Sequence, residues 1–386
     1  MHLLGVKQEG GYLHAERYAN NFKKVANEVT QSYCAIEGEE CFKLPFLYLD
    51  LNEVEGFFAF PSPEIFNKIV KNGKVKFFIH PDMIEEFEID EISGLIEVSP
   101  TSSTRTVLPL NEDFMIKMHL NRRLSRFIRR LKGSSVEHSV LISSEIEGGL
   151  ENSPETFAYL PESMGFIYKD KGFIIREIHP RPKISEKRVF LPLFSFYSDD
   201  LKDLSSQTLF EQLVSLRKKE PLQFFLDYFI EPIFKNMSYF INEYGLLLEC
   251  HGQNVLVELD NHFNIKRMIH RDFQSMYIDE KIRKSKGLSE KFCKHIMGKE
   301  CQREVSYSLV YDQYLGKYVL DNFTSLLNKR YNLDIELIKR KIKELFVKYF
   351  EVSSFPKNGY YVMKKAEFKG NSTEFEFIQG KPSYRP

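Results

Sequence analysis

The sequence predicts an α+β protein in which a strand-rich first half precedes a mostly helical second half. Short apolar runs, several of them with period two, recur between residues 46 and 178. Longer amphipathic runs with helical spacing occupy much of residues 190–350. A polar loop between two apolar strands near residue 250 places one β-hairpin inside the helical half.

Composition narrows the class of protein. The 386 residues are enough for two or three domains, at roughly 150 residues each. Lys+Arg and Asp+Glu both number 54, and this balance argues against nucleic-acid and membrane partners. The five cysteines form no C-x-x-C pair, which disfavours a disulfide scaffold or zinc module and fits a reducing compartment. No signal peptide or membrane-length apolar run is visible, so we expect a cytoplasmic protein.

The first half contains a series of predicted strands. They cover residues 46–51, 56–60, 75–81, 94–98, 105–110 and 114–120. In the last run, period two puts Phe114, Ile116 and Met118 on one face, with Lys117 and His119 on the other. A helix is predicted over residues 63–73 with Gly73 as its end, and a hairpin over residues 165–178 with its turn at 170–172.

Residues 121–133, NRRLSRFIRRLKG, predict a basic helix. Leu124, Ile128 and Leu131 form its apolar stripe, and Gly133 lies at its expected end. The functional interpretation is binding of nucleic acid or an acidic membrane. A core helix with a basic outer face is favoured instead, because the stripe is regular and only one aromatic residue lies among the arginines. Arg129 could still point into a site.

A boundary is predicted after Pro180 and Pro182, which gives domains over residues 1–185 and 186–386. A helix over 221–245 should end at Gly245 and be kinked or divided by Pro232. Residues 246–272 then predict strand, loop and hairpin, with the turn at Asp260-Asn261. Two further helices are predicted near 305–330 and 334–350.

The first candidate site is TSSTRT, residues 101–106. Hydroxyl groups donate to phosphate oxygens, and Arg105 supplies a planar, bidentate guanidinium. Lys117 follows twelve residues later and Arg129 another twelve residues after that. Three converging cations would suit a polyphosphate. The alternative is a Ser/Thr-rich loop beside solvated surface charges.

The second candidate site is LLLECHGQN, residues 246–254, with Asp272 at the end of the paired strand. Glu249, Asn254 and Asp272 offer hard oxygen ligands suited to Mg²⁺. His251 beside them could contact a developing oxyanion or a phosphate. The alternative interpretation is that these polar residues have a purely structural role. A zinc site of His251, His262 and His270 is disfavoured, because their spacing matches no standard pattern.

Several common catalytic motifs do not occur. His270-Arg271-Asp272 invites comparison with the protein-kinase catalytic loop, but Tyr277 stands where that loop has a metal-binding Asn. The sequence contains no G-x-G-x-x-G, no D-F-G, no P-loop and no G-x-S-x-G nucleophile elbow.

Taken in order, these motifs resemble the siderophore synthetases that work independently of nonribosomal peptide synthetases, the aerobactin synthetase (IucA/IucC) family. The matching elements are Ser103-Thr104-Arg105-Thr106, Lys117, Ile128-Arg129-Arg130-Leu131, Ile174-Ile175-Arg176-Glu177, Glu249-Cys250-His251-Gly252-Gln253-Asn254 and Arg271-Asp272. His80-Pro81 lies where the family has a His-Pro-Trp-Gln sequence. The resemblance extends over residues 75–275.

The resemblance implies an ATP-dependent ligase. The family adenylates a carboxylate of citrate or a related acid, releases pyrophosphate, and condenses the acid with an amine or alcohol, leaving AMP. By this resemblance, the residues that bind ATP are Ser103, Arg105, Thr106, Lys117 and Gln253. Arg129 and His251 would contact the α-phosphate and the reacting carboxylate. Mg²⁺ would be held by Glu249, Asn254 and Asp272.

The family fold is a cupped hand with β-rich fingers, a helical palm and a thumb. The resemblance implies fingers and palm here, with the hairpin in the palm and the thumb reduced or absent. The alternative function is a non-catalytic nucleotide-binding relative with a regulatory role. A phosphotransferase acting through Asp272 is less favoured. A homodimer is left open.

Overall fold

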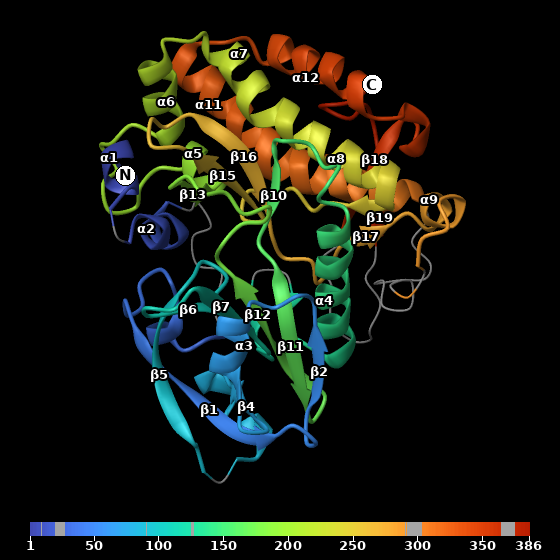
Figure 1. The fold of residues 1–386 in the computed structure, drawn as a ribbon. Helices are drawn as coiled ribbons and strands as arrows, with labels where there is room; N and C mark the ends of the chain where they lie inside the picture. The colour runs from blue at the N-terminus through green and yellow to red at the C-terminus, as the bar shows by residue number, and fades with distance from the viewer. Residues whose placement is uncertain are drawn as a thin grey trace.

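The computed structural model describes residues 1–8, 10–19, 28–89, 91–124, 127–289, 291, 303–363 and 375–386. Figure 1 shows a curled β-sheet in the lower half of the view and a layer of helices in the upper half. A long helix, α4 (Gly133–Gly148), runs between them along one side. The mixed α/β class predicted from the sequence is confirmed.

A nine-stranded antiparallel sheet forms the lower part. Its order is β2-β11-β12-β7-β6-β5-β1-β4-β3. The strands are β1 (Phe42–Asp50), β2 (Glu55–Phe58), β3 (Val70–Lys71), β4 (Lys74–Phe78), β5 (Gly94–Pro100), β6 (Thr106–Pro109), β7 (Phe114–Met118), β11 (Glu162–Tyr168) and β12 (Lys171–Glu177). All six strand runs predicted before residue 121, and the hairpin after residue 165, coincide with members of this sheet.

The two faces of this sheet differ in chemistry. Phe114, Ile116 and Met118 of β7 lie in a buried apolar cluster, as their period-two spacing predicts. Lys117 alternates to the opposite face, where it is buried beside polar partners. The sheet therefore contributes one face to a hydrophobic core and the other to a polar site.

The predicted helix over residues 63–73 is shorter in the structure. Helix α3 (Pro63–Ile69) ends four residues before Gly73. Gly73 instead occupies the turn between β3 and β4, with a φ of 75° that suits glycine. The prediction of Gly73 as the helix end is therefore wrong, because the chain leaves the helix to pair as an edge hairpin.

The upper part contains smaller sheets and most of the helices. One sheet has the order β10-β16-β15-β13, with β10 (Phe157–Tyr159), β13 (Val189–Pro192), β15 (Val255–Leu259) and β16 (Ile265–His270). Two short pairs are β14 (Leu246–Leu247) with β17 (Tyr277–Ile278), and β18 (Gly359–Met363) with β19 (Phe375–Gln379). The helices are α5 (Phe194–Tyr197), α6 (Leu209–Arg217), α7 (Pro221–Phe225), α8 (Glu231–Tyr244), α9 (Glu280–Ser285), α10 (Arg303–Ser308), α11 (Asp321–Tyr331) and α12 (Ile335–Tyr349).

Two helical stretches contain π-helical segments. Leu226–Ile230 joins α7 to α8 just before Pro232, so the run stays helical but its α-helical geometry is interrupted next to this proline. Gly245 ends α8 in the left-handed conformation at φ 61°, as predicted. A second π-helical segment, Leu309–Leu320, joins α10 to α11. Segments of this kind frequently mark functional sites. None of the described helices combines the length and apolarity needed to cross a bilayer.

The predicted basic helix over residues 121–133 is wrong. This stretch contains a short hairpin of β8 (Arg123–Leu124) and β9 (Phe127–Ile128). Backbone bonds cross it, with the Leu120 amide donating to the Arg129 carbonyl at 3.2 Å. Leu124 and Leu131 are buried as the apolar stripe predicted, but across a chain reversal rather than along one helix face. Gly133 begins helix α4 instead of ending a helix.

Helix α4 connects the two halves of the core. Near its start, Val136 packs with Ile167 and Ile174 against the nine-stranded sheet. Further along, Ile142 and Ile146 belong to the core of the upper part. Close contact with the sheet depends on Gly165 of β11, where an added Cβ would lie 2.4 Å from Val136 Cγ1.

We predict that Gly165→Ala lowers the free energy of unfolding by about 1–3 kcal/mol, because the added methyl group must displace α4 from the sheet. Denaturant unfolding measures this loss. Gly148→Ala, at a position with nothing within 4 Å of the added Cβ, is the matched control and should cost nothing. In a Gly165→Ala/Val136→Ala double variant, a loss equal to the sum of the single losses would contradict the steric explanation.

Candidate functional site

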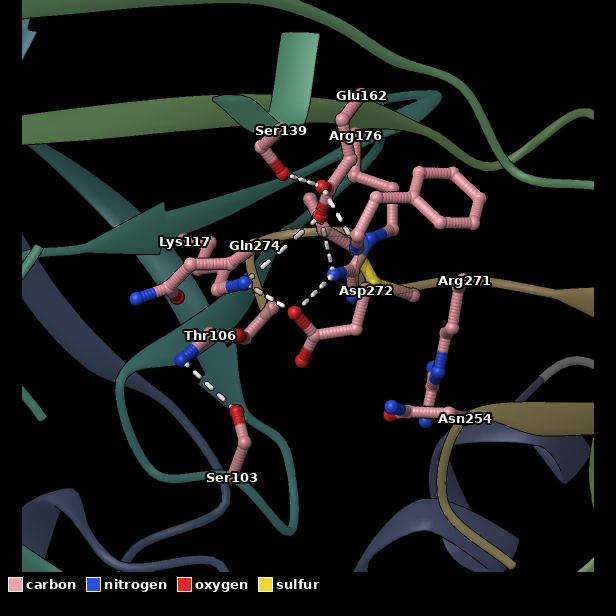
Figure 2. Close-up of polar contacts among 12 residues, drawn as sticks. Ser103, Thr106, Lys117, Ser139, Glu162, Arg176, Asn254, Arg271, Asp272 and Gln274 are labelled. Carbon is pink, nitrogen blue, oxygen red and sulfur yellow. Dashed lines mark hydrogen bonds and ion pairs between the residues drawn. The ribbon is translucent and has the colours of Figure 1, made fainter. Parts of the chain in front are cut away.

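The candidate site lies where the polar face of the nine-stranded sheet meets the end of β16 (Figure 2). Lys117 comes from β7, Glu162 from β11 and Arg176 from β12. Asp272 follows β16 and points at these three side chains from the other part of the molecule. Four charges from four separate segments therefore converge.

This charge cluster is closely packed. Lys117 Nζ donates to Asp272 Oδ1 and lies 3.9 Å from Glu162 Oε1. Arg176 Nη2 is 2.5 Å from Glu162 Oε1 and 3.8 Å from Asp272 Oδ1. The Lys117 side chain is 1% exposed and that of Glu162 is fully buried, whereas Asp272 retains 31%. Asp272 is thus the member of the cluster that faces outward.

Glu162 is the acceptor that organises the cluster. Its Oε2 accepts from Ser139 Oγ of α4, and from the Phe273 backbone amide at 3.1 Å. Its own amide donates to Ser143 Oγ at 2.9 Å. One buried carboxylate therefore joins β11, β12, α4 and the segment that carries Asp272.

A β-bulge turns Glu162 toward this face. Glu162 pairs with Arg176 and Met164 with Ile175, so Ser163 is an extra residue in β11. Without it, strict alternation would put Glu162 on the apolar face with Met164. Bulges near active sites re-aim side chains in this way.

The charges control one another's protonation. Burial raises the pKa of Glu162, but the positive charges of Lys117 and Arg176 outweigh it and hold this pKa below its ordinary value. Burial also opposes ionisation of Asp272, and Lys117, Arg176 and Arg105 together push its pKa far below the ordinary range. Both carboxyl groups are therefore ionised at neutral pH.

The TSSTRT loop is a tight turn between β5 and β6. Ser103 Oγ accepts from the Thr106 amide at 3.1 Å, and Thr101 Oγ1 donates to the Thr106 carbonyl at 2.8 Å. Thr104 has a φ of 62°, and Asp272 a φ of 72°. Left-handed conformations are uncommon for a β-branched residue. Such strain tends to gather at functional sites, and here it marks both segments of the candidate site.

Arg105 reaches from this loop to the β8–β9 hairpin. Its Nη1 donates to the Arg129 carbonyl at 3.0 Å and its Nη2 to Gln274 Oε1 at 2.9 Å. Burial and the like charge of Arg129 lower the pKa of Arg105 to about 10, so it stays charged at neutral pH. Arg105 thereby holds the backbone from which the Arg129 side chain extends.

The second candidate segment, residues 249–254, lies beside Asp272. Asn254 Nδ2 is 3.4 Å from Glu249 Oε2, and the Arg271 amide donates to the Asn254 carbonyl at 3.0 Å. Burial, together with the negative charge of Asp272, raises the pKa of Glu249 to about 8. Glu249 is therefore largely protonated at neutral pH, a condition that a bound cation would reverse.

His251 is a neutral hydrogen-bond donor. Burial lowers its pKa to about 4 against the opposing charge of Asp272, and the charges of Arg129 and Arg271 add to the effect of burial. Its Nδ1 accepts from the Gln253 amide at 3.2 Å, which leaves the ring proton on Nε2. Its ring lies 6.3 Å from that of Tyr314, on the π-helical segment Leu309–Leu320. Sequence reasoning did not single out Tyr314.

The predicted metal ligands are oxygen donors, which would suit Mg²⁺ better than zinc. Asp272, Glu249 and Asn254 supply carboxylate and amide oxygens, which are the donors that this hard cation prefers. Among the residues described, no group of three or more His, Cys, Asp and Glu side chains is arranged to hold a metal on its own. The zinc alternative fails because His270 is buried in its sheet, stacked on Phe157 and within 3.3 Å of Asn236.

The structure thus brings most of the predicted residues into one polar region. Contacts or mutual electrostatic effects link Arg105, Lys117, Arg129, Glu249, His251, Asn254 and Asp272. Gln253 Nε2 connects the two loops by donating to Ser102 Oγ at 2.9 Å. Sequence reasoning missed Glu162 and Gln274. No local pattern marks either residue, whereas Arg176 belongs to the Ile174-Ile175-Arg176-Glu177 element of the family resemblance.

Comparison with known proteins points to one family. Residues 79–191 match the model of the IucA / IucC family. This segment contains the TSSTRT loop, Lys117 and Arg129, whereas residues 249–254 and Asp272 lie outside it. No match is found among curated proteins.

The fold is similar to that of solved synthetases. ATP-bound aerobactin synthetase IucA from a hypervirulent pathotype of Klebsiella pneumoniae superposes with a TM-score of 0.71 at 14% identity, covering 94% of this chain and 74% of that one. Petrobactin biosynthesis protein AsbB from Bacillus anthracis superposes with a TM-score of 0.70 at 16% identity, covering 90% of this chain and 69% of that one. Aerobactin synthetase IucC from a hypervirulent pathotype of K. pneumoniae superposes with a TM-score of 0.65 at 14% identity, covering 84% of this chain and 65% of that one. The resemblance predicted from the motifs is confirmed.

We predict that Glu162→Gln lowers the free energy of unfolding by about 3–5 kcal/mol, because the two buried cations Lys117 and Arg176 then share a single carboxylate, that of Asp272. Urea unfolding provides the measurement. Glu344→Gln is the control, since the Glu344 side chain is 54% exposed and its pair with Lys341 lies at the surface. Equal losses in the two variants would show that the cluster carries no special energetic weight.

The buried side chain of His80 should make the stability of the protein depend on pH. It is fully buried, its Nδ1 accepts from the Asp82 amide at 3.2 Å, and its ring meets that of Tyr33 edge-on. Burial lowers its pKa from 6.5 to about 4, although the charge of Asp82 opposes this. Folded His80 therefore stays neutral over a pH range in which the unfolded chain takes up a proton.

As pH falls from 6.5 to 4, we predict that this mismatch removes about 3 kcal/mol of stability, at about 1.4 kcal/mol per pH unit. Urea unfolding of wild type and His80→Asn across this range measures it, and the variant should show the flatter dependence. His262→Asn, at an exposed turn, is the control. Parallel curves for wild type and His80→Asn would refute the prediction.

Proposed function

We propose that this chain, which matches the IucA / IucC family over residues 79–191 and shares the fold of its synthetases, is an ATP-dependent siderophore synthetase. It adenylates a carboxylate of citrate or a related acid and condenses that acid with an amine or alcohol. The observation that carries the proposal is the convergence of Arg105, Lys117 and Arg129 with Asp272 and the 249–254 segment. We further propose that residues 1–185 act as fingers and residues 186–386 as a helical palm.

The proposed nucleotide site combines cations with short polar loops. Ser103, Arg105 and Thr106 would supply donors to the ATP phosphates, together with Gln253, which is hydrogen-bonded to the same loop through Ser102. Lys117 would contribute its positive charge, while its ammonium group keeps Asp272 in place. A buried region with excess positive charge suits a polyphosphate. The ATP-bound state of the similar aerobactin synthetase supports ATP as the ligand.

Mg²⁺ is the proposed metal, held by Asp272, Glu249 and Asn254. The raised pKa of Glu249 supports this assignment, because a cation between Glu249 and Asp272 would relieve the repulsion that contributes to it. When bound, the metal would offset negative charge on the phosphates. Lys117 and Arg176 would hold Asp272 in place as a ligand.

The chemistry requires positioning more than a protein nucleophile. A carboxylate oxygen of the acid attacks the α-phosphorus, the bond to the β-phosphate breaks, and pyrophosphate leaves. Arg129 and the Nε2–H of neutral His251 stabilise the negative charge that grows on the α-phosphate. The nitrogen or oxygen nucleophile then attacks the acyl carbon, releasing AMP and a proton.

We predict that the folded protein releases pyrophosphate with ATP, Mg²⁺, citrate and a panel of polyamines, amino acids and alcohols. Arg129→Ala and His251→Ala should each lower kcat by about 10²–10³-fold, the usual cost of removing a donor to transition-state charge. A coupled pyrophosphate assay measures the rate. Removing Mg²⁺ with a chelator should abolish it.

Matched controls separate these effects from general damage. Arg130→Ala alters the exposed neighbour of Arg129, and His262→Ala alters an exposed histidine, so both should keep wild-type rates within about twofold. No pyrophosphate with any acid, despite measurable ATP binding, would favour a non-catalytic binding protein. ADP in place of AMP as the product would favour a phosphotransferase.

A further inference from the structure

Helix α2 (Gly11–Tyr18) lies beside β13 at the junction of the two parts of the molecule (Figure 1). The Tyr12 ring packs edge-on against Phe190 of β13 at 5.2 Å. Arg17 donates to the backbone carbonyls of Ala35, Glu39 and Glu40, so the helix is also fixed to the segment that leads into the nine-stranded sheet. These contacts hold α2 beside the candidate site.

Glu16 of α2 is a buried carboxylate with partners in both parts of that site. Its side chain has no solvent exposure. Its Oε1 accepts from Arg271 Nη2 at 2.6 Å and from Tyr12 Oη at 2.8 Å. Its Oε2 accepts from Ser102 Oγ at 3.1 Å. One carboxylate thus contacts the TSSTRT loop and the residue that precedes Asp272.

Arg271 and Ser102 are in turn hydrogen-bonded to Gln253 of the 249–254 segment. Arg271 donates from Nε to the Gln253 carbonyl at 2.9 Å and from Nη1 to Tyr12 Oη at 2.7 Å. Ser102 Oγ, which donates to Glu16, accepts from Gln253 Nε2 at 2.9 Å. Glu16, Arg271, Gln253 and Ser102 therefore form a closed ring of hydrogen bonds.

We propose that Glu16 is a positioning residue that fixes the TSSTRT loop, the 249–254 segment and Asp272 relative to one another, so that they can bind ATP together. The TSSTRT loop belongs to the nine-stranded sheet, whereas residues 249–254 and Asp272 flank the paired strands β15 and β16 of the smaller sheet. The side chain of Glu16 joins the two sheets from a third element. As the buried counter-charge of Arg271, it also fixes the backbone next to Asp272, whose own φ is 72°. Glu16 does not touch the reacting atoms. The proposal rests on the proposed function for the identity of the nucleotide.

The test compares Glu16→Gln with Glu258→Gln in the full chain. Glu258 is the matched control, because it too is a buried carboxylate paired with an arginine: it is 2% exposed and lies 2.6 Å from Arg267 Nε. It differs in position, since it lies toward the turn of the β15–β16 hairpin, away from the candidate site. Isothermal titration with Mg-ATP should show a dissociation constant at least about tenfold higher than that of wild type in Glu16→Gln. In Glu258→Gln the dissociation constant should stay within about twofold of wild type. Thermal unfolding should show a lower Tm for both.

Two readouts go beyond a general loss of stability. In steady-state assays, KM for ATP should rise in Glu16→Gln while KM for the acid stays within about twofold of wild type. The effects of Ser102→Ala and Glu16→Gln on the free energy of ATP binding should not add up in the double variant, because each substitution breaks the same ring of hydrogen bonds. Equal effects of Glu16→Gln and Glu258→Gln on ATP affinity would overturn the proposal.

Amide hydrogen exchange tests the positioning without any nucleotide. Residues 99–108 and 250–256 should exchange faster in Glu16→Gln, but not in Glu258→Gln. Unchanged exchange there would overturn the proposal whatever the affinities are. If wild type binds no ATP, the proposed function fails, and this experiment still decides the role of Glu16. If Glu16→Gln does not fold, Tyr12→Phe, which removes the phenol shared by Glu16 and Arg271, is judged by the same exchange criterion.

Discussion

The buried charge cluster of Lys117, Glu162, Arg176 and Asp272 is the interaction on which the arrangement of the site depends. It joins the polar face of the large sheet to the segment after β16. Glu162 sits at its centre with no exposure to water, so each cation around it must stay in place to keep it neutralised. Because Glu162 also holds Ser139 and the Phe273 amide, the sheet, α4 and the Asp272 segment adopt one relative position.

Such a cluster is costly as a source of stability, since desolvation offsets much of the attraction between buried charges. Its value lies in geometry. Lys117 and Arg176 keep Asp272 ionised in a left-handed conformation, with its carboxylate facing outward. Burial keeps His251 neutral and Glu249 largely protonated. The region therefore holds more positive than negative charge in the absence of ligand, and this imbalance suits a small polyanion accompanied by a divalent metal.

The strands were predictable because the large sheet has one apolar face. Phe114, Ile116 and Met118 alternate with Lys117, and that alternation is visible in the sequence. The basic run 121–133 was not predictable in the same way. Its spacing of Leu124, Ile128 and Leu131 fits one face of a helix, yet the chain reverses there. Contacts distant in sequence support the reversal, including Arg105 to the Arg129 carbonyl and Asn121 to Glu86. Tertiary bonds outweighed local propensity.

The sequence by itself determined the class of fold, the order of the strands along the chain, and the residue types from which a phosphate and metal site could be built. It did so because burial imposes a period on apolar residues and because few side chains suit these ligands. The tertiary structure decided which of these residues meet. The bulge at Ser163 turns Glu162 toward Arg176, and Glu16 reaches Arg271 and Ser102 from a helix far away in sequence. Neither contact leaves a local signal, since both depend on register and packing between separate elements.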